Sequence, residues 1–241
     1  MVAATAFDAP DGGAAPAMHG RVLEAVGSAI AEGVLPSGSR LTLEGLQQEY
    51  GVSRTVARDV MKVLESMNLV YSRRRVGIVV QERSLWNAFD PDLVRWRLNS
   101  PQRELQYSSL TELRIAVEPI AAAGAARRAS AAERARLVFL AAELRRLGEA
   151  GELEAFLAVD IEFHSLLLRS CGNEMFAALE GMVAEVLTSR TKQGLMPFKP
   201  RNEALQAHED VAAAVSRGDA VMAETAVHHI LDEVRNAMGL L

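Results

Sequence analysis

The sequence predicts a mainly α-helical chain with one small β hairpin in its first third. Ala, Leu, Val, Arg and Glu dominate and aromatic residues make up only 5% of the chain, which favours helices packed through aliphatic faces. Apolar residues recur at helical spacing over most of the 241 residues. Consecutive β-prone runs stand out only between Leu69 and Val80, so the sheet is expected to be small.

The chain is long enough for two domains, and its charge is divided unevenly between them. Residues 1–18 are rich in Ala, Gly and Pro without an apolar period, and we predict a disordered tail there. Residues 19–83 carry nine Lys or Arg against seven Asp or Glu, whereas residues 84–241 carry 17 against 22. A basic head in front of an acidic body is expected if only the head meets phosphate.

The cysteine count and the hydropathy bear on location. Cys171 is the only cysteine, which excludes an internal disulfide framework and suits a reducing cytoplasm. No stretch approaches the roughly 20 consecutive apolar residues that span a bilayer. Residues 1–18 contain no Lys or Arg for a signal peptide. We therefore expect a cytoplasmic protein with no membrane partner.

Three helices are expected at the start of the head. Apolar residues at helical spacing occupy residues 19–32, and Gly33 follows as a helix-ending residue. Thr42 is expected to cap a short helix that ends at Tyr50, and Ser53 is expected to cap a third helix. The third helix carries its apolar residues on one face and begins with basic and hydroxyl residues.

A β hairpin with a basic tip is expected behind these helices. The runs 69–71 and 76–80 are β-prone and flank Arg73, Arg74 and Arg75. Helix, turn, helix and basic hairpin together form a winged helix-turn-helix pattern. We expect the three arginines of this wing to reach the minor groove or flanking phosphates of DNA, although such a run taken alone is commonly a solvated loop.

The third helix is the predicted recognition helix. Arg54 and Arg58 are four residues apart and project from one face, where a guanidinium can bind guanine O6 and N7. Ser53, Thr55 and the amides at the start of the helix suit phosphate oxygens. Taken alone, an arginine pair of this kind is more often a solvated helix face.

Behind Trp86, long amphipathic stretches predict six or so helices that form a second, all-α domain. Helix breaks are expected near Asn99–Pro101, Ala150–Gly151, Cys171–Asn173, Met196–Pro197 and Gly218. The predicted domains are therefore residues 19–83 and residues 84–241.

The head resembles the GntR family of bacterial regulators over Pro36 to Val80. The matches include G-V-S-R-T-x-x-R from Gly51 to Arg58, L-x-x-x-x-L-V ending at Val70 and a wing that contains Gly77. The resemblance implies a homodimer that binds double-stranded operator DNA and adds Gly77 to the DNA-binding residues. One departure is the run Leu43–Gly45, because many relatives carry there an Arg that touches the DNA backbone.

The remainder, from Asn87 to Ala237, resembles the FCD ligand-binding domain of the FadR-type branch. Residues 86–96 are similar to the galactonate-type, sugar-acid repressors of that branch. The E-L-R-x-x-x-E-P run at 112–119, D-x-x-F-H at 160–164 and His208 are further matches. The resemblance implies an antiparallel helical bundle with a central pocket. It also implies a repressor of a sugar-acid or other small-carboxylate operon, released or altered when its effector binds.

Three side chains suggest a metal site. Asp160 and His164 lie one turn apart on one helix face, and His208 lies on another helix that can face them. Such donors suit Zn²⁺, Mn²⁺ or Ni²⁺, and the resemblance favours a metal over a satisfied polar cluster. The resemblance places Ile230 where the last histidine ligand normally stands. His229 points about 100° away on a regular helix, so it is a fourth ligand only in a shifted or bulged helix.

Two arginines are candidates for effector binding. Arg114 can pair with an effector carboxylate through its planar fork, and an intrahelical pair with Glu118, four residues on, is the alternative. Arg190 is the second candidate.

Two other classes of protein compete with this interpretation. A metal-dependent enzyme would use Asp160, His164 and His208 with water as nucleophile. It lacks an evident general base, and the sequence has no Gly-rich phosphate loop, G-x-S-x-G elbow or H-E-x-x-H motif. A helical adaptor without DNA binding leaves the R-T-x-x-R spacing and the wing unexplained. We therefore predict a regulator that is not an enzyme.

Overall fold

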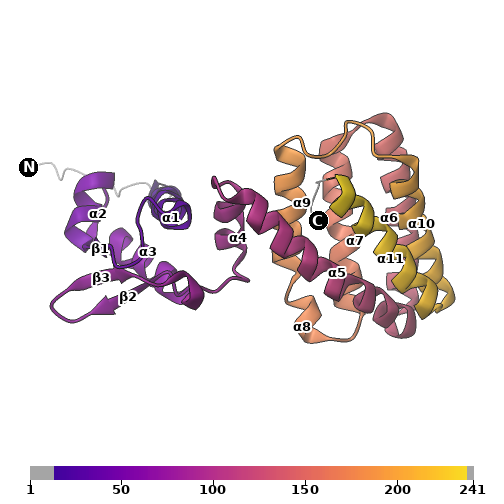
Figure 1. Ribbon diagram of the computed structural model, residues 1–241, viewed down its shortest axis with the longest axis horizontal. Coiled ribbons are helices and arrows are strands. Elements are labelled where there is room, and N and C mark those ends of the chain that lie inside the picture. Colours follow the sequence, from indigo (N-terminus) through magenta and orange to yellow (C-terminus); the bar gives the residue numbers. More distant parts are fainter. Residues whose placement is uncertain (1–13, 238–241) are drawn as a thin grey trace, which may run out of the picture. The chain divides into compact units, whose positions relative to one another are not determined.

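The computed structural model describes residues 14–237 (Figure 1). The chain forms two compact units, and the boundary between them in the sequence falls between Ala88 and Phe89. Helix α1 begins at Ala14, inside the segment predicted as a disordered tail, and residues 1–13 lie outside the described residues. Alanine favours helix, and Pro16 falls in the first turn, where a missing N–H costs no bond. The first unit extends past the predicted boundary at Arg83 because the Asn87 amide donates to the Met67 carbonyl, 2.9 Å away.

The first unit contains the three predicted helices: α1 (Ala14–Glu32), α2 (Leu43–Tyr50) and α3 (Arg54–Ser66) (Figure 1). Both predicted caps are confirmed. The Thr42 hydroxyl accepts from the Gly45 amide at 3.0 Å, and the Ser53 hydroxyl accepts from the Val56 amide at 3.3 Å. These bonds satisfy amides that have no partner within the helix, so each helix starts where its cap residue lies.

A three-stranded antiparallel sheet forms the wing, with β1 (Arg40–Leu41), β2 (Val70–Arg73) and β3 (Gly77–Val80) in the order β1-β3-β2. The hairpin is confirmed. Strand β1 was not predicted, because two residues are too few to show alternation. Gly77 has a φ of 101°, and a Cβ there would lie 3.0 Å from the Leu41 carbonyl oxygen, so the packing of the wing requires a glycine.

The core of the first unit lies between α1, α3 and the sheet. Its fully buried members include Val26 and Ile30 of α1, Val60 and Leu64 of α3, and Val80 of β3. Because these residues recur every three or four positions along α3, the opposite face of that helix is exposed.

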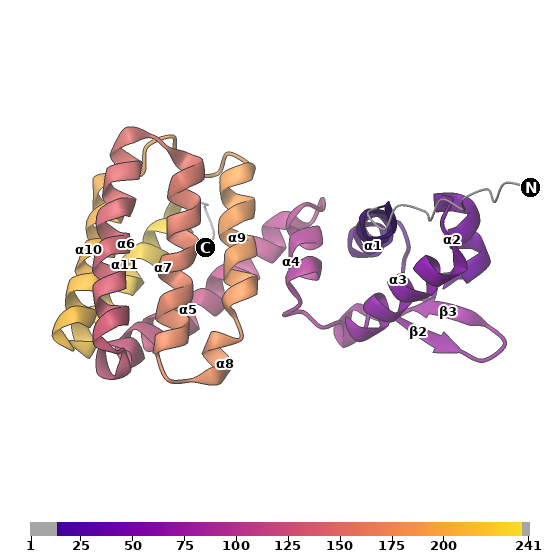
Figure 2. The same ribbon diagram turned by 180° about the vertical axis from the view of Figure 1, so that it is seen from behind.

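The second unit is all-helical within the described residues, as predicted (Figure 2). Its helices are α4 (Pro91–Leu98), α5 (Arg103–Arg128), α6 (Ala131–Ala150), α7 (Leu153–Ser170), α8 (Glu174–Ala177), α9 (Glu180–Lys192), α10 (Asn202–Arg217) and α11 (Ala220–Ala237). All predicted breaks fall between helices. The break between α5 and α6 was not predicted, although Ser130 and Glu133 form a capping box there.

Helix α6 packs beside both α7 and α10, and α11 packs against α5 and α10 (Figures 1 and 2). One apolar cluster fills the space between α5, α6, α7, α10 and α11, and a second joins α4, α5, α7 and α9. Several charged side chains are buried where α5, α7 and α10 approach one another. None of the described helices is long and apolar enough to cross a membrane.

Candidate functional site

The exposed face of α3 carries the predicted recognition residues. Arg54, Thr55 and Arg58 are exposed, and so is Ser53 at the helix start. The Ser53 oxygen already accepts the Val56 amide, which leaves its O–H to donate. The four side chains therefore share one basic, solvent-facing end of the helix.

The wing presents its arginines to solvent as well. Arg73, Arg74 and Arg75 are all exposed, and the turn closes through a bond of 3.1 Å from the Val76 amide to the Arg73 carbonyl. Arg75 has a φ of 64°, a conformation that a non-glycine residue rarely adopts. The wing therefore ends in a short turn that carries three exposed arginines.

The second unit contains a pocket of about 350 Å³ lined by residues of α5, α7, α9, α10, α11 and the segment 193–201. Its lining includes Arg114, Asp160, His164, Arg190 and His208. The predicted metal and effector residues therefore meet in one pocket, apart from His229.

Asp160, His164 and His208 form the core of this pocket. They offer ligand atoms that lie within 4.8 Å of one another, and all three residues are buried. The Asp160 Oδ1 lies 3.3 Å from His208 Nε2 and 3.5 Å from His164 Nε2. Oδ1 and His208 Nε2 are nevertheless buried without a hydrogen bond among the described residues. Converging donor atoms that do not bond to one another fit a divalent cation.

The other ring nitrogen of each histidine faces a fixed acceptor. His208 Nδ1 lies 2.7 Å from the Ala204 carbonyl oxygen, and His164 Nδ1 lies 2.8 Å from Glu118 Oε2. The Ala204 carbonyl holds a proton on His208 Nδ1 and turns its Nε2 toward Asp160, whereas His164 Nδ1 lies at ion-pair distance from Glu118 but makes no hydrogen bond among the described residues. Metal-binding histidines are commonly oriented in this way.

Glu118 also binds Arg114, which confirms the intrahelical pair, while the role of Arg114 in effector binding stays a prediction. The Arg114 Nε donates to Glu118 Oε1 at 2.5 Å and its Nη2 donates to Oε2 at 3.3 Å, while Arg114 also lines the pocket. Burial raises the pKa of Glu118, but Arg114 and His164 together lower it to about 2. Burial lowers the pKa of His164, but Glu118 and Asp160 raise it to about 9. The two carboxylates therefore favour the protonated form of His164.

Arg190 differs from Arg114 in having no carboxylate partner among the described residues. Its Nε is buried without a hydrogen bond, and its Nη2 lies 3.3 Å from the sulfur of Met196. Burial lowers the pKa of Arg190, and Arg114 lowers it further, whereas Asp160 raises it. A half-buried guanidinium whose Nε has no hydrogen bond among the described residues favours an anionic ligand in the pocket.

The fourth predicted metal ligand is not brought to the cluster. Ile230 is buried and lines the pocket, whereas the side chain of His229 is exposed. Helix α11 is regular through this region, so consecutive residues point about 100° apart. The shift or bulge that His229 would need is absent from the described part of α11.

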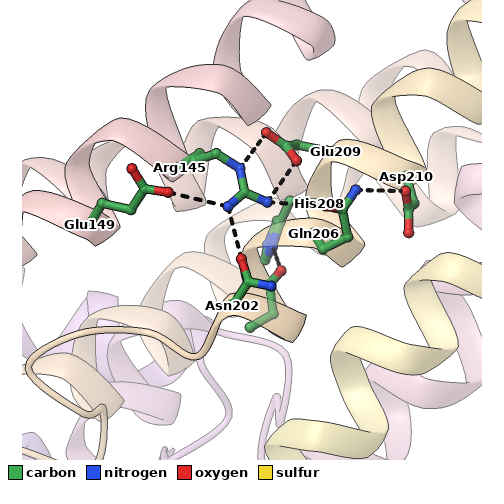
Figure 3. Close-up of polar contacts among 8 residues, drawn as sticks. Arg145, Glu149, Asn202, Gln206, His208, Glu209 and Asp210 are labelled. Carbon is green, nitrogen blue, oxygen red and sulfur yellow. Dashed lines mark hydrogen bonds and ion pairs between the residues drawn. The ribbon is translucent and has the colours of Figure 1, made fainter.

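An arginine that the sequence analysis missed fixes the helix that carries His208. Arg145 of α6 binds both oxygens of Glu209 at 2.6 and 2.7 Å and the Asn202 side chain at 3.0 Å (Figure 3). Glu209 and Asn202 both belong to α10, so these bonds fix its rotation beside α6. His208, next to Glu209, then faces the pocket. Arg145 and Glu209 are 64 residues apart in the sequence, so no local pattern indicates that they bind each other.

Comparison with known families and proteins supports both halves of this description. Residues 19–80 match "Bacterial regulatory proteins, gntR family", and residues 109–233 match "FCD domain". The galactonate operon transcriptional repressor of Escherichia coli strain K12 is 29% identical over 210 residues, which cover 86% of this chain and 90% of that relative. The probable D-xylose utilization operon transcriptional repressor of Paenarthrobacter nicotinovorans is 27% identical over 204 residues, which cover 83% of this chain and 80% of that relative.

A solved structure supports the fold. Lar, which controls the expression of the Listeria monocytogenes agr system, superposes with a TM-score of 0.53 at 16% identity and covers 98% of this chain and 100% of its own. At that identity the likeness bears on the fold alone.

Proposed function

This chain belongs to the GntR family of bacterial regulatory proteins and carries an FCD domain, and from that premise we propose that it is a cytoplasmic, effector-responsive repressor. It acts on an operon for the use of a sugar acid or another small carboxylate, and it binds its operator as a homodimer. The observation that carries the proposal is the pocket, which is lined by a cluster of metal-ligand type and by half-buried Arg190, whose Nε is buried without a hydrogen bond and which forms no ion pair among the described residues. The similarity to repressors named for galactonate and xylose operons favours this class of operon.

The head supplies the operator contact. Arg54 and Arg58 read guanine in the major groove, while Ser53, Thr55 and the wing arginines bind phosphate or the minor groove. Gly77 allows the wing to pack closely on β1 and so sets where its tip lies. One recognition helix reads too few bases to be specific alone, which is why a two-fold dimer on a palindromic operator is proposed.

The pocket supplies the response. Arg190 pairs with a carboxylate of the effector, and the outer edge of the Arg114 fork is available for a second contact because Glu118 takes only its Nε and Nη2. An effector changes operator affinity only if it binds two arrangements of the protein unequally.

Asp160, His164 and His208 would hold a divalent cation such as Zn²⁺, Mn²⁺ or Ni²⁺. When bound, such a cation supplies positive charge and open coordination positions for the effector carboxylate. His164 must lose its proton to coordinate, so acid weakens the site. Metal analysis of protein purified without chelator or affinity tag tests this: stoichiometric metal that is lost in His164→Ala supports the site. Substoichiometric metal that is unchanged in His164→Ala contradicts it, and the three side chains then bind the effector directly.

The competing interpretation as a metal-dependent enzyme gains no support from the comparisons, because the similar proteins are transcriptional regulators. The cluster needs no hydrolytic role to explain it, because the same pocket is suited to binding an anion.

A thermal-shift screen of sugar acids and other small carboxylates tests the effector class. A ligand at 100 times its Kd stabilises the folded state by about 2.7 kcal/mol, which is enough to raise the melting temperature. Hits that shift the wild type but not Arg190→Ala support the proposal. A panel that yields no stabilising carboxylate, with or without added Zn²⁺, Mn²⁺ or Ni²⁺, contradicts it.

A further inference from the structure

A carboxylate lies on the face of the first unit that carries the recognition residues. Glu44, in the first turn of α2, places its Oε1 2.9 Å from Nη1 of Arg54, the first residue of α3. The Thr42 cap, which binds the Gly45 amide at 3.0 Å, fixes the turn that holds Glu44. The cap therefore fixes the backbone position from which the Glu44 side chain reaches Arg54.

Stability does not account for this pair. The side chains of Arg54 and Glu44 are 62% and 60% exposed, and exposed pairs contribute only about 0.2–1 kcal/mol to folding. A negative charge near a phosphate-binding face also weakens DNA binding, since like charges repel. A benefit in recognition is needed to offset that cost.

We propose that Glu44 is a specificity-determining residue that positions Arg54 for base reading and penalises binding to phosphate alone. The inference rests on the proposed function as a DNA-binding repressor. Glu44 takes one N–H of Nη1 and leaves the parallel donors of the Nε–Nη2 edge for guanine O6 and N7. Holding a flexible arginine before DNA arrives lowers the entropy that the base contact must offset.

Repulsion supplies the second half of the effect. Unrelated DNA has no guanine at the position that Arg54 reaches. Repulsion between Glu44 and phosphate then lowers affinity, because no guanine contact offsets it. On the operator, the guanine contact outweighs that repulsion. Specificity is a difference between two affinities, and a repulsive group that acts mainly on the wrong partner increases it.

Arg58, one turn further along α3, provides an internal comparison. It is exposed like Arg54 but forms no ion pair among the described residues. Loss of Glu44 should therefore alter the base preference that depends on Arg54 and leave the preference that depends on Arg58 unchanged.

The test compares Glu44→Ala and Glu44→Gln with Glu49→Gln, which removes the same charge from an exposed position of the same helix. Binding is measured by fluorescence anisotropy on a duplex selected by the wild type from a random pool, and on a scrambled duplex of equal composition. Base preference is measured by replacing each guanine of the selected duplex in turn. Melting temperatures check that every variant is folded.

For Glu44→Ala we expect scrambled-duplex affinity to rise about two- to fivefold, the size of one exposed charge interaction. We expect the ratio of selected to scrambled affinity to fall at least about fivefold, which is the lower limit for the loss of one base contact. The loss should occur at the guanine whose preference Arg54→Ala also abolishes. Glu44→Gln keeps an acceptor for Arg54 and should raise scrambled-duplex affinity while keeping more of the base preference.

The inference is overturned if Glu44→Ala leaves the affinity ratio and the Arg54-dependent guanine preference unchanged, or if Glu49→Gln changes them equally. A wild-type protein that does not distinguish any selected duplex from its scrambled form overturns the proposed function, and the inference with it.

Discussion

One arginine–glutamate pair lies among the predicted site residues of each unit, and these two pairs differ in almost every physical respect. Arg114 and Glu118 are buried, with side chains 4% and 3% exposed, and make two hydrogen bonds within one helix. Arg54 and Glu44 are more than half exposed, come from two helices and make one bond. The same chemical pair is therefore a fixed internal support in the second unit and, in the proposed function, a contact that DNA can replace in the first.

The difference between the two pairs follows from their unequal exposure to water. A buried ion that loses its partner remains desolvated and costs several kcal/mol, whereas an exposed ion that loses its partner is hydrated at once. The pocket can thus hold its groups in place only as a complete network, while the exposed face of α3, which we propose binds DNA, can exchange its partners. Four changes test this contrast.

The largest effect is expected in the buried network. Glu118→Gln removes the carboxylate between Arg114 and His164, and we expect a loss of about 3–5 kcal/mol in the free energy of unfolding. Urea denaturation measures it, and Glu44→Gln, in the exposed pair, should change the same quantity by only about 0.2–1 kcal/mol. Equal losses in the two variants would remove the contrast between the pairs.

Effector binding should depend on Arg190 to a smaller extent. Arg190→Ala removes a charged hydrogen bond to the effector, which we expect to weaken binding by about 1.5–3 kcal/mol in isothermal titration with a carboxylate found by thermal shift. Arg201 also lines the pocket, but its side chain is 72% exposed, so Arg201→Ala should have a smaller effect. The assignment fails if the order of these two effects is reversed.

Base reading should depend on the α3 arginines. Arg54→Ala or Arg58→Ala should cost about 1–3 kcal/mol on the selected duplex and far less on a scrambled one. Anisotropy titrations measure both, and Arg136→Ala, an exposed arginine of the second unit, controls for net charge. Equal reductions on both duplexes would mean that these arginines bind phosphate alone.

The wing should have the smallest effect on specificity. Replacing Arg73, Arg74 or Arg75 with alanine should lower the slope of log affinity against log salt by about 0.9 for each phosphate that the wing no longer neutralises, on both duplexes alike. Titrations at several salt concentrations measure the slope. An unchanged slope in the variant that lacks all three arginines would mean that the wing does not contact DNA.

The head could be predicted closely because its signals are local. Thr42 and Ser53 act through amides three residues away, and the left-handed Gly51 ends α2 next to its last turn. The hairpin was visible as two β-prone runs. Strand β1 and the Glu44–Arg54 pair could not be predicted, because both depend on how separate elements pack.

The pocket could be predicted only in part. Asp160 and His164 meet because four residues make about one helical turn, and that spacing is visible in the sequence. The bridge from Glu118 to His164 and the support from Arg145 to Glu209 join different helices, so no periodicity shows them. The spacing did show correctly that His229 points away from the position of Ile230.

The most direct test of the division into a reading head and a sensing pocket is one anisotropy titration. Wild type, Arg190→Ala and Arg58→Ala are each titrated onto the selected duplex, with and without the stabilising carboxylate. We expect the carboxylate to change the Kd of the wild type for the duplex. The Kd of Arg190→Ala should stay the same with and without the carboxylate, and equal to that of the wild type without it. Arg58→Ala should bind DNA poorly, yet the carboxylate should still raise its melting temperature. A wild-type Kd that no stabilising carboxylate changes, or an Arg190→Ala protein that responds at the same concentration as wild type, would contradict the account.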